Sequence, residues 1–122
     1  MIFRLWHGWT SRADADRYQQ LLESVIVPGI IDRGIDGLVG IDILRRDEDV
    51  DPRRASHRAR SEGAADEVEF VTLMTFDDRA AVAAFAGPDL TASVVPPAAR
   101  QLLARFDEHS QHYERVARHA AS

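Results

Sequence analysis

The stretch EVEFVTLMTF, residues 67–76, has the clearest strand pattern in the chain. β-Branched and aromatic residues predominate in it, and alternation places every second side chain on one face of a strand. One such face carries Val68, Phe70, Thr72, Met74 and Phe76. Residues 67–76 are therefore predicted to form a strand whose apolar row packs in a core or lines a pocket.

Three other segments have a strand-like composition. Residues 2–9 and the stretch GLVGIDILRR, residues 37–46, are rich in β-forming residues. The segment SQHYERVA, residues 110–117, is predicted to be the last strand.

A helix is predicted between the first two strands. Ser11 followed by Asp14 is a helix N-cap signal. The next apolar residues fall at i, i+3, i+4 and i+7, which is the spacing of one helical stripe: Tyr18, Leu21, Leu22 and Val25. Pro28 is expected to break or kink this helix, and Gly34 and Gly37 are expected at turns or at the helix C-terminus.

Two shorter helices are predicted in the second half of the chain. Asp77 or Asp78 caps an alanine-rich helix that runs through Phe85 and stops at Gly87. Pro97 suits the first turn of the next helix, whose apolar stripe comprises Ala99, Leu102, Leu103 and Phe106.

The predicted order of elements is β-α-β-β-α-(α)-β, the split β-α-β or ferredoxin-like plan of an α+β protein. This plan has one antiparallel sheet in the strand order 4-1-3-2, with helices on one face. The uncovered face is expected to be buried against a second copy, so a homodimer is predicted. Residues 1–122 are predicted to form a single domain, in which the charged segment 47–66 is a long mobile loop.

Composition excludes several classes of protein. The chain has no cysteine, so disulfides, thiolate metal sites and cysteine nucleophiles are excluded. A net charge of −5 argues against a nucleic-acid partner. No signal peptide is evident, and no apolar stretch approaches the ~18–20 residues of a membrane helix. We therefore expect a soluble, cytoplasmic protein.

Four segments carry a resemblance to a known family: MIFRLWHGWT, VEFVTLMTFDD, AFAG and QHYERV. Together they resemble the antibiotic-biosynthesis-monooxygenase-type family of dimeric α/β barrels, over nearly the whole chain except residues 47–66. The resemblance implies the fold, the dimer and a pocket in each protomer between sheet and helices. Characterised relatives include cofactor-free oxygenases of polycyclic aromatic phenols and quinone precursors, and haem-degrading oxygenases. The haem branch uses a histidine after the second helix. The corresponding stretch of this chain, GPDLTASVVPP, contains no histidine, so no haem is expected, and no other cofactor is expected either.

The predicted topology brings the end of the first strand beside the start of the last one. Trp6 and His7 are therefore expected close to His112 and Tyr113. A cofactor-free oxygenase needs a base to deprotonate an electron-rich phenol, so that the resulting carbanion can pass an electron to O₂. Histidine suits the role of base and tryptophan supplies flat walls, which makes His7, His112 and Tyr113 candidate catalytic residues. Strand alternation puts Trp6 and His7 on opposite faces, so at most one of them points into a given cavity.

The candidate substrate-binding residues are Trp6, Trp9, Phe70, Met74, Phe76 and Arg45. The same tryptophans are also explained by core and dimer packing, and Arg45 by a solvated charge pair. The alternatives to an oxygenase are a barrel that binds a small hydrophobic ligand without turnover, and a cyclase or isomerase that uses the same pocket. No histidine and carboxylate spacing predicts a metal site, and no nucleotide-binding or hydrolase motif occurs.

Overall fold

The computed structural model describes residues 1–46 and 67–121. In these ranges the chain is an α+β protein with a five-stranded antiparallel sheet and three helices. The strands are β1 (Ile2–Ser11), β2 (Leu38–Arg45), β3 (Glu67–Phe76), β4 (Leu103–Phe106) and β5 (Gln111–Glu114). The first helix combines α1 (Ala15–Leu21), a π-helical turn η1 (Leu22–Ile26) and α2 (Val27–Asp32), and the other two are α4 (Arg79–Ala86) and α5 (Pro97–Leu102). The predicted loop at 47–66 lies outside the described residues.

The sheet has the order β2-β3-β1-β4, and β5 also pairs with β1. β1 and β3 pair over their whole length, from Ile2 opposite Phe76 to Ser11 opposite Glu67. On the other edge of β1, β5 pairs with its first half and β4 with its second half, so the two short strands follow one another along it. The order β2-β3-β1 agrees with the prediction, and the predicted last strand, which corresponds to β5, pairs with β1 as expected. β4 is an additional strand that was not predicted.

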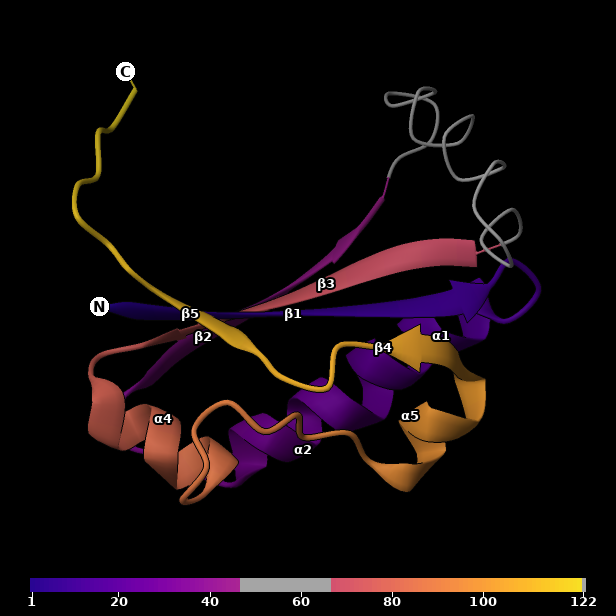
Figure 1. Ribbon diagram of the computed structural model, residues 1–122, viewed down its shortest axis with the longest axis horizontal. Coiled ribbons are helices and arrows are strands. Elements are labelled where there is room, and N and C mark those ends of the chain that lie inside the picture. The colour runs from indigo at the N-terminus through magenta and orange to yellow at the C-terminus, as the bar shows by residue number, and fades with distance from the viewer. Residues whose placement is uncertain (47–66, 122) are drawn as a thin grey trace.

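The helices form one layer, which packs on a single face of the sheet (Figure 1). Two groups of buried side chains fill the space between the layers. One group comprises Ala15, Tyr18, Leu22, Val68, Phe70 and Ala99, and the other comprises Met74, Phe76, Ala81, Val82 and Phe85. Within the described residues, no helix covers the opposite face of the sheet.

The first helix departs from its predicted pattern at the π-helical turn. Residues 22–26 wind with an i→i+5 ladder, which shifts the phase of the side chains that follow. Val25, predicted to face the core, is 59% exposed, and Ile26 packs against the core instead. Of the break or kink predicted at Pro28, the break is not found, because the helix continues to Asp32 with the proline in the first turn after η1.

The predicted helical stripe after Pro97 is wrong in its second half. The helix ends at Leu102, and Leu103 and Phe106 belong to β4, opposite Thr10 and Gly8 of β1. By pairing with the free edge of β1, the backbone N–H and C=O groups of this segment form hydrogen bonds that a longer helix would otherwise provide.

The predicted turns and caps of the other elements are found. Asp78 is the N-cap of α4, where its Oδ1 accepts from the Ala81 N–H at 2.9 Å. Gly37 has φ +90 and approaches Ala81 so closely that a Cβ would lie 2.7 Å from that residue's Cβ, hence glycine is required at this turn. None of the helices in the described ranges is long and apolar enough to cross a membrane.

Candidate ligand-binding site

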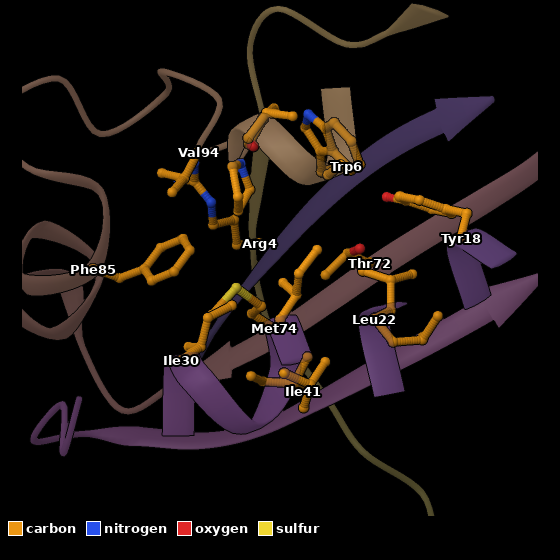
Figure 2. Close-up of a pocket in the computed structure, with 17 residues that line it drawn as sticks. Arg4, Trp6, Tyr18, Leu22, Ile30, Ile41, Thr72, Met74, Phe85 and Val94 are labelled. Atoms are coloured by element: carbon orange, nitrogen blue, oxygen red, sulfur yellow. The ribbon is translucent and has the colours of Figure 1, made fainter. Parts of the chain in front are cut away.

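A cavity lies between the sheet and the helices, where the two groups of core residues meet (Figure 2). Its volume is about 60 Å³. Because one water molecule needs roughly 10–15 Å³ of such volume, the cavity has room for about four to six waters or one substituted six-membered ring. Its wall is predominantly apolar and comprises Arg4, Trp6, Tyr18, Leu22, Ile26, Val27, Ile30, Ile41, Ile43, Thr72, Met74, Phe85, Val94, Val95, Pro96, Ala99 and Ser110.

Trp6 is a fixed part of this wall. Its indole Nε1–H donates to Ser93 Oγ at 3.0 Å and to the Asp107 carbonyl oxygen at 2.9 Å. Its ring lies 5.9 Å from that of Phe106, measured between centroids. Because both ends of the side chain are held, the indole presents a rigid flat surface to the cavity.

Tyr18 supplies a polar group to the same apolar space. Its side chain is 2% exposed and packs edge-on against Phe70. The hydroxyl points into the space between Trp6 and Thr72 (Figure 2) and has no hydrogen-bond partner among the described residues. Burial raises the pKa of Tyr18 to about 12, so the hydroxyl stays protonated at neutral pH and can donate.

Arg4 closes the cavity near α4. Its guanidinium lies over the Phe85 ring, 5.3 Å from the centroid, and donates to the carbonyl oxygens of Leu90 and Ala92. Nη1 also lies 3.0 Å from His112 Nε2. Since arginine only donates, this contact makes Nε2 the acceptor and places the imidazole proton on Nδ1.

His112 is therefore a neutral imidazole behind Arg4. Burial, and secondly the charge of Arg4, lower its pKa below the usual value. His112 does not line the cavity, because Arg4 stands between them. Together with Tyr113 it borders a separate, wider groove of about 560 Å³ beside the start of α4.

His7 lies on the opposite face of the sheet, in a polar cluster. The carboxylate Oδ2 of Asp107 accepts from both the backbone N–H of His7, at 3.0 Å, and its Nδ1–H, at 2.7 Å. The Trp9 ring stacks on the imidazole at 5.8 Å between centroids, and Glu69 Oε2 lies 4.0 Å from Nε2. The alternation predicted for Trp6 and His7 is thus found, and Trp6 is the residue that faces the cavity.

The predicted approach of Trp6 and His7 to His112 and Tyr113 is wrong. His112 stands opposite Arg4 and Tyr113 opposite Phe3, which are two and three residues before Trp6 along β1. The reason is β4, which occupies the edge of β1 that the last strand was expected to fill. Tyr113 is 54% exposed and does not line the cavity.

The other predicted binding residues divide between the cavity and its surroundings. Met74 lines the cavity, whereas Phe70 and Phe76 are buried in the two halves of the core beside it. Trp9 faces away with His7. Arg45 lies at the surface, where Nη1 bonds to Asp16 Oδ1 at 2.8 Å and to Gln19 Oε1 at 3.0 Å.

Three polar residues of the cavity, Arg4, Tyr18 and Ser110, escaped the sequence prediction as site residues. Arg4 could have been found, because it precedes Trp6 by two positions on the same strand face. Tyr18 was predicted only as part of the helical stripe. No pattern in the sequence indicated Ser110 as a site residue.

No group of three or more histidine, aspartate or glutamate side chains that could hold a metal occurs in residues 1–46 and 67–121. Comparison with protein-family models, with curated proteins and with solved structures finds no match for this chain.

Proposed function

We propose that the protein binds a small hydrophobic molecule in the cavity between Trp6 and Tyr18. The observation that carries this proposal is the hydroxyl of Tyr18, which faces an apolar cavity and has no hydrogen-bond partner among the described residues. Apolar pockets with a few polar groups that fix a ligand's orientation are the usual form of small-molecule sites. The volume suits a ligand with a single ring.

We further propose that the fold is ferredoxin-like and that two copies assemble through the open face of the sheet. The strand order β2-β3-β1-β4 and the single helical layer support the fold. The open face carries Phe3, Leu5 and Trp9, and Leu44 and Tyr113 on it are more than half exposed. Apolar surface of this kind is typical of an interface. Sedimentation at micromolar concentration should give a dimer, and a monomer would refute this assembly.

The ligand proposal is tested by filling the cavity from one side. Thr72 lies on the cavity face of β3, and Thr75 on the opposite face, as their partners Trp6 and Phe3 on β1 show. Thr72→Leu adds apolar volume inside the cavity, and Thr75→Leu is the matched control. Calorimetric titration with toluene should show saturable binding to the wild type and to Thr75→Leu, weakened at least tenfold in Thr72→Leu. Equal affinities in both variants would place the ligand elsewhere, and no binding to the wild type would refute the proposal.

A cofactor-independent monooxygenase is the second candidate function. It is supported by the neutral imidazole of His112, which borders the wider groove of about 560 Å³ and could act there as the base. In such a reaction a CH₂ group of a phenolic substrate becomes a carbonyl, and the second oxygen atom of O₂ leaves as water. The Nε2 lone pair faces Arg4, so Arg4 must first shift for His112 to accept a proton from a substrate.

Oxygen uptake distinguishes the two functions. Purified protein with anthrone-type or naphthol-type substrates should consume O₂ without flavin, nicotinamide or metal if it is a monooxygenase. His112→Ala should then reduce the rate by roughly 10²–10⁴-fold. Binding without uptake supports the ligand-binding function alone.

A further inference from the structure

Arg4 is a buried cation without a counter-ion in the part of the chain that the structure describes. It is 3% exposed, and no carboxylate among the described residues lies within 4 Å of its guanidinium. Its three contacts are to neutral acceptors, namely two carbonyl oxygens and the imidazole of His112. Since buried charges are normally paired, such a cation in a cavity wall points to a negative charge supplied from outside the chain.

Some N–H groups of the Arg4 guanidinium form no hydrogen bond with the described residues. A guanidinium has five N–H groups, and the contacts of Nη1 and Nη2 account for three of them. Nε–H and one N–H of Nη2 have no acceptor among the described residues. A neighbouring pair of this kind is what arginine uses to bind both oxygens of a carboxylate.

Ser110 is a second, independent observation at this cavity. It is 5% exposed, it belongs to the cavity wall, and its buried Oγ has no partner in the described part of the chain. A buried hydroxyl without a partner is unfavourable unless a ligand completes its hydrogen bond.

The surroundings of Arg4 provide little negative charge of their own. Asp89 is the one carboxylate with a resolved electrostatic effect on Arg4, and it is exposed and bonded to the N–H and hydroxyl of Thr91. His112, the other titratable group facing Arg4, is neutral in this arrangement.

We infer that the cavity binds a small monocarboxylate, whose carboxylate pairs with Arg4 and Ser110 while a single-ring or branched apolar body fills the space toward Tyr18. This inference rests on the proposed function and specifies the class of ligand. Benzoate has the required size and charge. Its isostere benzamide lacks the charge, and toluene lacks the polar group altogether.

The experiment compares these three probes with the wild-type protein by calorimetry and NMR. Benzoate should bind at least tenfold more tightly than benzamide, because hydrogen bonds to a charged group contribute about 1.5–3 kcal/mol and 1.4 kcal/mol is tenfold. Ser110→Ala should weaken benzoate but not toluene, and Ser24→Ala on the exposed side of the first helix is the matched control. Arg4→Gln should abolish the preference for benzoate. If Arg4→Gln does not fold, the comparison of Ser110→Ala with Ser24→Ala still tests the inference.

A second readout follows the imidazole of His112 by NMR. Bound benzoate offsets the charge of Arg4, so the pKa of His112 should rise on addition of benzoate and stay unchanged with toluene. Toluene binding with no preference for benzoate over benzamide would overturn the inference and leave the proposed cavity intact. Failure of all three probes to bind would overturn both.

Discussion

Gly8→Ala tests whether the residues around Gly8 on β1 pack too closely to accept one additional methyl group. Gly8 is buried on β1 between Trp6 and Thr10, on the face that carries the helices. A Cβ at this position would lie 2.9 Å from Leu103 Cδ2 and 2.9 Å from two atoms of the Trp6 ring, Cη2 and Cζ3. Trp6 cannot swing away without breaking the hydrogen bonds of its Nε1–H to Ser93 and Asp107.

The expected loss follows from these contacts. Overpacking a well-packed site costs about 1–3 kcal/mol, which for a domain of this size lowers Tm by roughly 3–15 °C. Gly40→Ala on β2 is the control, because a Cβ there meets no atom within 4 Å. Its free energy of unfolding should change by less than about 1 kcal/mol. The free energy of unfolding of both variants is measured by urea denaturation. Equal effects of the two substitutions would refute the claim that a side chain at position 8 has no room between Trp6 and Leu103 of β4.

Three further outcomes are expected. In Tyr113→Phe the remaining phenol, that of Tyr18, should ionise near pH 12 in a near-ultraviolet titration, and a value near 10 would show that it is exposed. Burial and the charge of Arg4 lower the pKa of His112 in the folded protein. As the pH falls below about 6.5, the imidazole therefore becomes protonated in the unfolded chain before it does so in the folded one, and the free energy of unfolding decreases. His112→Gln should weaken that pH dependence in urea denaturation at a series of pH values, and an unchanged dependence would contradict it. Asp107→Ala removes the acceptor of two His7 N–H groups and should lower the free energy of unfolding by about 1–3 kcal/mol, whereas a neutral result would show that the pair is not formed.

Strand patterns in the sequence predicted the sheet well, since alternation is a local property. The bounds of β3 agree with the prediction to the residue, and the order β2-β3-β1 with the last strand on β1 follows the predicted plan. The two failures have physical causes that no local pattern reveals. A π-helical turn changed the phase of the first helix after Leu22, and pairing with the edge of β1 converted Leu103–Phe106 from a predicted helix into a strand.

The site was less predictable than the fold because it depends on register. Alternation correctly separated Trp6 from His7, but the position of β5 along β1 set His112 beside Arg4 instead of Trp6. That register depends on β4, which the sequence did not predict. The absence of a carboxylate beside Arg4 among the described residues becomes evident only once its neighbours in space are known.

The most direct test of the central claim is an NMR structure of the protein saturated with toluene. If the cavity is the ligand site, intermolecular nuclear Overhauser effects should connect the toluene ring to the methyl groups of Met74, Ile41 and Leu22, which line it. They should be absent from the methyl groups of Leu5 and Val71, which belong to the opposite face of the sheet. Contacts confined to Leu5 and Val71, or no contacts at saturating toluene, would contradict the account.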